Sequence, residues 1–198
     1  MINMKAVTLR IQKAAFMMVA WGILILAASV MTQFFELSAD YVLLMWAGAT
    51  VLGILAQVYC LVNGLQANLT VWIVLIAIGW GFTLFVMKFD NGSHIDLYGD
   101  QAGVWLILMG LGYVATAFHV VKRFLILAAI HIVAGIVMEL SARGIVPIDF
   151  LNTYSSLVFG LVAGVPLIIA GLPMWYRPAP AKAGAPVPAS GPATERTT

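Results

Sequence analysis

Three polar residues inside apolar segments are the strongest candidates for chemistry in this chain. They are Gln57, His119 and His131. An imidazole exchanges a proton near neutral pH and an amide can hydrogen-bond a solute, so the three residues would suit a proton relay or a small-solute path. The same side chains could instead join neighbouring helices by hydrogen bonds, with His119 reaching the membrane surface. The sequence leaves both interpretations open.

The three residues are expected to lie at similar depths in a membrane, which is why we group them. On helices that span the membrane, Gln57 would lie about one and a half turns from the end of its helix. His119 and His131 would lie about one and two turns from the basic pair Lys122-Arg123. At about 1.5 Å per residue, all three fall within roughly 8 Å of one another in depth. We therefore predict an intramembrane polar layer made of Gln57, His119 and His131.

Two histidines on neighbouring helices would also suit a b-type haem with two axial imidazole ligands. Consecutive helices of a tight hairpin pack about 8–10 Å apart, which is too close for a haem between them. A haem would need splayed helices or a ligand from another subunit. We therefore expect no cofactor. A b-type haem redox subunit remains a further alternative for the function, after the two given at the end of this subsection.

Two charged residues would meet near the opposite face of the membrane. Lys88 follows the third apolar segment and Glu139 nearly ends the fifth, so they would lie at similar depths and form an outer ion pair. A local alternative pairs Glu139 with Arg143 one turn later, and Lys88 with Asp90. Both arrangements are compatible with the sequence.

No recognisable motif assigns a metal site or a catalytic residue. The segment DNGSHIDLYGD gathers oxygen and imidazole ligands that can hold a divalent cation, but Asn91-Gly92 is an ordinary turn signal. Acidic loops are usually just solvated, so we expect no metal ion. The sequence has no Walker loop, dinucleotide fingerprint, HExxH pair or GxSxG elbow. We therefore expect a protein that is not an enzyme.

Composition indicates what kind of fold positions these residues. Of the 198 residues, 63% are hydrophobic and 9% are charged, whereas a typical soluble domain has about 25% charged residues. Water cannot solvate so apolar a chain, so lipid must be its solvent. The formal net charge of +2 and the lack of a basic stripe argue against nucleic acid as a partner. We predict an all-α, polytopic membrane protein with short loops.

Six segments are long and apolar enough, or nearly so, to span a membrane, which takes roughly 20 residues. They cover residues 14–35, 41–62, 70–87, 103–121, 124–140 and 151–175. We expect a six-helix transmembrane domain over residues 14–176, preceded by an amphipathic cytoplasmic terminus, residues 1–13. Residues 177–198 are rich in proline and alanine, which predicts a disordered cytoplasmic tail.

The pair Lys122-Arg123 separates the fourth segment from the fifth. From Gly103 to Met138 only this pair interrupts the apolar run with charge. A single helix of that length would be close to twice the membrane thickness and would place both charges near its centre, at roughly 2.5–3.5 kcal/mol each. A hairpin that puts both charges in water is more favourable. The pair therefore predicts two helices and an even total of six.

Basic residues predict the orientation, because Lys and Arg gather in cytoplasmic flanks. With both termini on one side, that side holds Lys5, Arg10, Lys13, Lys122, Arg123, Arg177, Lys182 and Arg196, against Lys88 and Arg143 opposite. We therefore expect both termini in the cytoplasm, and the plasma membrane as the location. Aromatic residues are expected at the two membrane surfaces: Tyr41, Trp105, Phe150 and Tyr154 outside, Trp72, Trp175 and Tyr176 inside.

The last segment carries a helix-packing face. Ser156, Gly160 and Gly164 place a small residue at every fourth position, which lets another helix approach closely in lipid. This face would pack inside the bundle or join two copies of the chain. We expect an accessory or assembly subunit of a membrane complex, with the lipid bilayer and a homo-oligomer or larger complex as partners. A small-solute, ion or proton pathway is the alternative.

Overall fold

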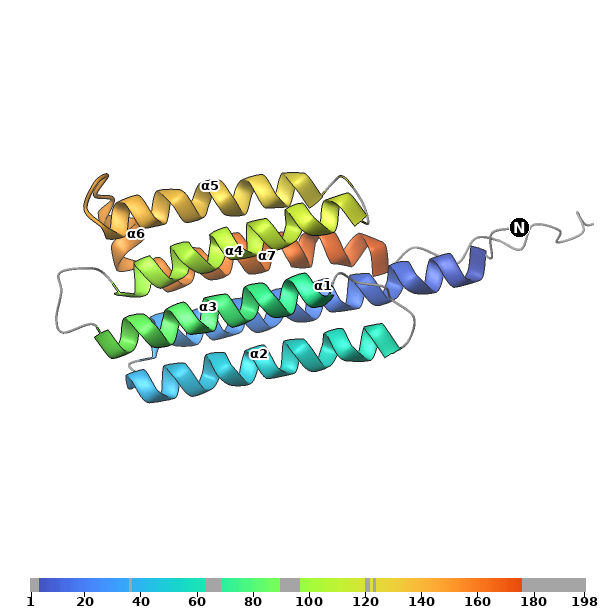
Figure 1. The fold of residues 1–198 in the computed structure, drawn as a ribbon, viewed down its shortest axis with the longest axis horizontal. Helices are drawn as coiled ribbons and strands as arrows, with labels where there is room; N and C mark the ends of the chain where they lie inside the picture. Colours follow the sequence, from blue (N-terminus) through green and yellow to red (C-terminus); the bar gives the residue numbers. More distant parts are fainter. Residues whose placement is uncertain are drawn as a thin grey trace, which may run out of the picture.

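The structure, a computed structural model, describes residues 4–35, 37–62, 69–89, 97–119, 122 and 124–175. These residues form seven α-helices, and six of the helices are long and apolar enough to cross a membrane. This confirms the predicted all-helical class and the six long apolar segments. The six long helices lie side by side along the longest dimension of the molecule (Figure 1).

The helix bounds differ from the predicted ones mainly at the helix starts. The helices are α1 (Met4–Phe34), α2 (Ala39–Val62), α3 (Leu69–Phe89), α4 (Leu97–His119), α5 (Phe124–Ala142), α6 (Asp149–Thr153) and α7 (Ser155–Trp175). Helix α1 includes most of the terminus that we predicted as a separate segment, because no Gly or Pro interrupts the chain before Gly22. Helix α4 begins six residues before position 103.

Both termini of the helical bundle lie at the same end. Helix α1 begins, α7 ends and the α4–α5 connection turns at this end, which we call the terminal end (Figure 1). Lys122, in that connection, is exposed. The α1–α2 connection and α6 lie at the opposite end. The structure thus groups the turn at Lys122 with the start of α1 and the end of α7, as the hairpin prediction requires.

The predicted last segment is divided into two helices at Tyr154. Gln33 of α1 stabilises this break with both halves of its amide group. Its Nε2 donates a hydrogen bond to the carbonyl oxygen of Thr153 at 3.0 Å, and its Oε1 accepts one from the backbone N–H of Leu157 at 3.3 Å. Backbone groups at a helix start have no partner within the helix, so the Gln33 side chain supplies one.

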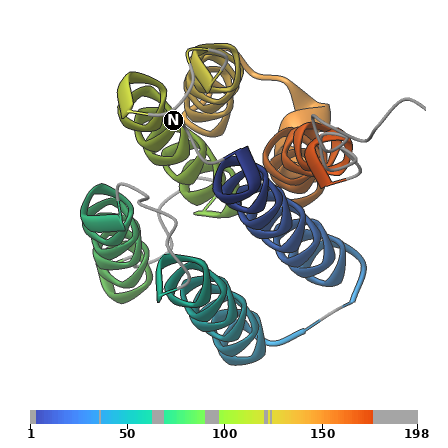
Figure 2. The same cartoon turned by 90° about the vertical axis from the view of Figure 1, so that its right-hand side faces the viewer.

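Two closely packed helix pairs form the centre of the bundle, α1 with α7 and α4 with α5 (Figure 2). Glycines face each other in both pairs. A Cβ atom on Gly164 would lie 2.7 Å from the carbonyl oxygen of Gly22, and one on Gly135 would lie 2.7 Å from that of Gly103. For helices as apolar as these, a lipid surrounding would give no hydrophobic drive for association, so close backbone approach and dispersion would hold the pairs together.

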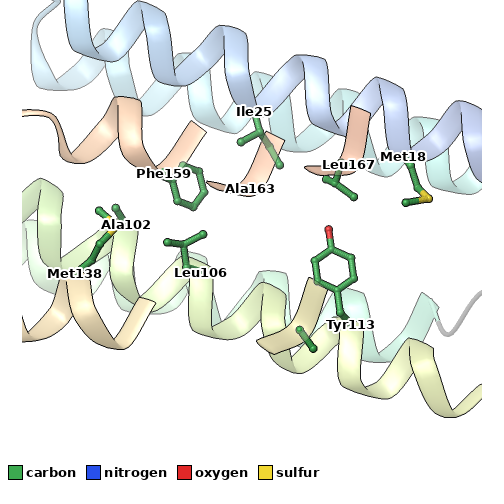
Figure 3. Packing of buried hydrophobic residues seen from close by; sticks show 10 residues of the cluster. Met18, Ile25, Ala102, Leu106, Tyr113, Met138, Phe159, Ala163 and Leu167 are labelled. Carbon is green, nitrogen blue, oxygen red and sulfur yellow. The ribbon is translucent and has the colours of Figure 1, made fainter. Parts of the chain in front are cut away.

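Large apolar side chains fill the space between these two pairs. Figure 3 shows Leu106 and Tyr113 of α4 facing Phe159 and Leu167 of α7. Leu106 is completely buried. This cluster joins the two pairs into one core, so α1, α4, α5 and α7 form a single four-helix unit.

Helices α2 and α3 lie outside this four-helix unit. Helix α2 packs mainly on α1, and α3 packs mainly on α4. Only 11% of the apolar stretch that is long enough to span a membrane is buried in each of them, against 39% in α1 and 44% in α4. Side chains such as Leu44 and Leu55 of α2 and Ile78 of α3 are more than half exposed. The described structure therefore has a packed core and two peripheral helices.

Candidate functional site

His131 lies at the interface between α5 and α4 and is completely buried. Its Nδ1 lies 2.7 Å from the carbonyl oxygen of Leu127. A carbonyl can only accept, so Nδ1 carries the proton and donates it. Nε2 then holds a lone pair, and no donor reaches it from the described residues. The site thus presents one buried hydrogen-bond acceptor in a fixed orientation.

Tyr113 of α4 is the nearest aromatic neighbour of His131. The two ring centroids are 5.0 Å apart in an edge-to-face arrangement. Tyr113 also stacks on Phe124 of α5 at 6.0 Å and meets Trp72 of α3 edge-to-face at 5.3 Å. These contacts join α3, α4 and α5 in an aromatic cluster near the terminal end, which leaves the imidazole no direct exposure to solvent.

The surroundings of His131 do not fit a haem between α4 and α5. On either side of it the two backbones approach closely: a Cβ on Gly110 would lie 3.1 Å from the carbonyl oxygen of Ala128, and one on Gly135 would meet Gly103. The haem alternative therefore finds no support in this geometry. A b-type haem would require the two helices to separate.

The structure does not bring Gln57 to His131. Gln57 is buried in α2, one turn after Gly53, which Trp21 of α1 covers. His131 of α5 instead faces Tyr113 of α4. Helices α2 and α5 lie on opposite sides of the bundle (Figure 2). His119 is the last residue of α4, and its side chain lies outside the described residues. Of the predicted polar layer, the structure thus places Gln57 and His131 at separate helix interfaces. Tyr113, not Gln57, is the neighbour of the histidine.

Glu139 takes part in the local ion pair. Its Oε2 accepts a hydrogen bond from Nε of Arg143 at 3.0 Å, the pairing one turn along the helix that the sequence offered as an alternative. Its Cγ lies 2.9 Å from where a Cβ on Gly103 would be, so the glycine makes room for this side chain. Lys88 is exposed in the last turn of α3.

The acidic segment DNGSHIDLYGD, from which we expect no metal ion, is described only from Leu97, where α4 begins. Residues 90–96 of the acidic loop lie outside the described residues. Within the part of the chain that the structure describes, no group of three or more His, Cys, Asp or Glu side chains is arranged to hold a metal ion.

Four tryptophan–threonine hydrogen bonds link neighbouring helices, three of them between a peripheral helix and the core, and the sequence analysis missed them. Each indole N–H donates to a threonine hydroxyl on a neighbouring helix. The pairs are Trp46–Thr32 at 3.0 Å, Trp80–Thr50 at 3.3 Å, Trp105–Thr83 at 3.1 Å and Trp72–Thr116 at 3.2 Å. They connect α2 to α1, α3 to α2 and, twice, α3 to α4. Trp72 and Trp105, expected at the membrane surfaces, thus face the bundle.

Three of the four threonine hydroxyls donate their own proton within their helix and accept the indole N–H with a lone pair. The hydroxyls of Thr32, Thr50 and Thr116 donate to the carbonyl oxygen four residues earlier, at 2.8–2.9 Å. The hydroxyl oxygen then retains lone pairs for the indole. Threonine within a spanning helix is the one sequence signal for these bonds, but it does not identify the tryptophan partner.

The predicted packing face of the last helix lies against α1. A Cβ on Gly160 would collide with the side chain of Ser29, and one on Gly164 would meet Gly22. Ser156, the first residue of the face, is partly buried. Of the two arrangements that the sequence allowed, the structure thus shows packing inside the bundle.

We expect substitutions at His131 to affect stability through the bond to Leu127. His131→Leu removes the side-chain donor, so the Leu127 carbonyl keeps only its helical bond to the backbone N–H of residue 131. The substitution also fills the site with a branched side chain, and we expect a lower melting temperature. His131→Gln can keep the hydrogen bond and should be closer to the wild type. Thermal unfolding in detergent, followed by near-UV circular dichroism, measures both. If the two variants were equally destabilised, the hydrogen bond would not be the main contribution of His131.

Comparison of the chain with protein-family models, with curated proteins and with solved structures gives no match. The arrangement of the helices and of their buried polar atoms is therefore what bears on the function.

Proposed function

We propose that this chain is a non-enzymatic, multi-pass membrane protein that acts as an accessory or assembly subunit of a membrane complex. In this proposal both termini lie in the cytoplasm and the complex lies in the plasma membrane. The observation that carries it is the division between a glycine-packed core and two helices, α2 and α3, that bury only 11% of their spanning windows. A bundle built in this way has two helices whose faces can contact another membrane protein.

The distribution of charge supports the orientation. Lys122 lies in the α4–α5 connection at the terminal end, and Lys5, Arg10 and Lys13 precede the span that begins at Ala15. Asp149 lies at the opposite end, in α6. An excess of Lys and Arg marks the cytoplasmic side. The terminal end is therefore the cytoplasmic end in this proposal.

Two exposed glycines mark the faces that a partner helix would contact. Among the described residues, no side chain and no neighbouring helix comes within 4 Å of the position that a Cβ would take on Gly48 of α2 or on Gly81 of α3. Each lies among exposed apolar residues, such as Leu44 and Leu52 near Gly48 and Leu84 near Gly81. Small residues let the backbone of another helix approach in lipid. Both glycines are thus available for a contact outside the chain.

Leucine at these glycines tests the proposal. We expect Gly48→Leu and Gly81→Leu to fold as the wild type does, because both side chains would point into open space, and to lose the partners that co-purify in mild detergent. The measurement is quantitative mass spectrometry of affinity-purified complexes, with melting temperature as the check on folding. Gly53→Leu is the control for an internal glycine, because the indole of Trp21 covers Gly53.

Two results would contradict the proposal. The first is that the Gly48→Leu, Gly81→Leu double variant keeps all partners of the wild type. The second is that the purified protein alone carries ions or a small solute across liposomes and loses this flux with Gln57→Leu or His131→Gln. That result would instead support the pathway alternative.

A further inference from the structure

Trp21 departs from the pattern of four other tryptophans in the described helices. Trp46, Trp72, Trp80 and Trp105 each donate their indole N–H to a threonine on a neighbouring helix. The Nε1 of Trp21 is also buried, yet none of the described residues accepts from it. Buried indole N–H groups usually find an acceptor, because lipid and protein interior offer none by default. Trp21 thus presents a donor inside the bundle.

Gln57 of α2 presents the complementary group. Its side chain is only 6% exposed. Its Oε1 is buried and receives no hydrogen bond from the described residues. An indole N–H can only donate a hydrogen bond, and an amide oxygen can only accept one. A molecule that accepts from Nε1 of Trp21 and donates to Oε1 of Gln57 would therefore give both atoms a partner.

Packing at Gly53 brings these two groups to the same place. The indole of Trp21 occupies the space where a side chain on Gly53 would lie. Gln57 follows Gly53 by one turn, and Cβ positions four residues apart in a helix are about 5–6 Å from each other. Gln57 therefore lies next to the turn of α2 that the Trp21 ring covers.

The directions of the two helices make the side chains converge. Side chains on a helix lean toward its amino terminus. Helices α1 and α2 are antiparallel, so Trp21 leans toward the terminal end while Gln57 leans away from it, toward Gly53. The donor and the acceptor thus approach each other along the α1–α2 interface, but they are not bonded to each other.

We infer that Trp21 and Gln57 form a binding site for one water molecule between α1 and α2. The water oxygen accepts from Nε1 of Trp21, and one of its hydrogens is donated to Oε1 of Gln57. A single water satisfies both buried atoms, and buried water is a regular part of protein interiors where polar atoms would otherwise lack partners. The site is separate from the His131 cluster and does not depend on the proposed assembly function.

A double-mutant cycle tests the coupling of the two residues. We expect Gln57→Met, which keeps the size of the side chain, to lower the melting temperature by roughly 2–4 °C when Trp21 is present. In the Trp21→Phe background the same change should have an effect of less than about 1 °C, since the water then has lost its donor. As a control, Gln57→Met and Trp46→Phe should be additive, because Trp46 bonds to Thr32.

Isotope-edited NMR in detergent identifies the bridging molecule. The ¹⁵N signal of the Trp21 indole is assigned by its loss in Trp21→Phe, and we expect it to show a magnetisation-transfer peak with water that Gln57→Met abolishes. Three results would overturn the inference: a Gln57→Met variant as stable as the wild type, strict additivity with Trp21→Phe, or no transfer from water to the Trp21 indole. Coupling without that transfer would mean a direct bond between the two side chains.

Discussion

Gly164→Ala will lower the melting temperature of the detergent-solubilised protein by roughly 4–12 °C, which corresponds to about 2–3 kcal/mol of overpacking. The new methyl group would lie 2.7 Å from the carbonyl oxygen of Gly22 and 3.1 Å from Cβ of Leu26. A flexible side chain could move aside, but the Gly22 carbonyl belongs to the backbone of α1. Helices α1 and α7 must therefore separate slightly along their whole contact. Gly164→Ile should prevent folding into a monodisperse protein.

Gly48→Ala is the matched control, because it makes the same chemical change in another spanning helix. In the described part of the chain, no other helix comes within 4 Å of the new methyl group there. Alanine favours a helix over glycine by up to about 1 kcal/mol, so this variant should be as stable as the wild type or slightly more stable. If Gly164→Ala had as little effect on the melting temperature, α1 and α7 would not pack as closely as the structure shows.

The helices themselves follow from local features of the sequence. Lys122 is an example. A charge at the centre of a bilayer is so unfavourable that the apolar segment from Gly103 to Met138 was predicted to form two helices and not one. The structure has α4 and α5 on either side of this residue. The free energy of placing the Lys122 charge in the bilayer centre depends on one short segment, so it can be evaluated without knowing how the helices pack.

The pairing of the helices could not be predicted in the same way. Gly160 and Gly164 predicted a face for close helix packing. Nothing in the sequence of α7, however, indicates that this face contacts Gly22 and Ser29 of α1. The chain has 18 glycines, and packing depends on which of them meet. That depends on the arrangement of all six long helices, which single segments do not contain.

The candidate site was predictable only in part for the same reason. Gln57 and His131 were identified because polar residues in lipid need partners. Two residues at the same depth in a membrane can lie on helices at opposite sides of a bundle. The prediction therefore grouped Gln57 and His131, which lie at separate helix interfaces. Tyr113 escaped attention since a tyrosine in a spanning segment is ordinary, and its contact with His131 appears only once α4 and α5 are paired.

Trp105→Ala will loosen α3 from the core and is the second large effect that we expect. The Trp105 indole lies over Gly79 of α3, at 2.6–2.8 Å from where a Cβ on that glycine would be. It also donates to Thr83 and meets Trp80 edge-to-face at 6.2 Å. Removing a fully buried tryptophan side chain costs about 3–5 kcal/mol. Trp105 is partly buried, so we expect a cost at the lower end of that range, and α3 has few other contacts to replace it. Hydrogen exchange should then rise more in α3 than in α1, α5 or α7.

Thr83→Val separates the hydrogen bond from the packing in this contact. Valine keeps the shape of threonine but cannot accept from the Trp105 indole. Hydrogen bonds between membrane helices contribute about 0.6 kcal/mol on average and up to about 1.7, so Thr83→Val should be much milder than Trp105→Ala. Trp105→Phe combined with Thr83→Val should cost less than the sum of the two, because no donor or acceptor is then left unpaired. If Thr83→Val instead matched Trp105→Ala, the hydrogen bond and not the indole on Gly79 would hold α3 in place.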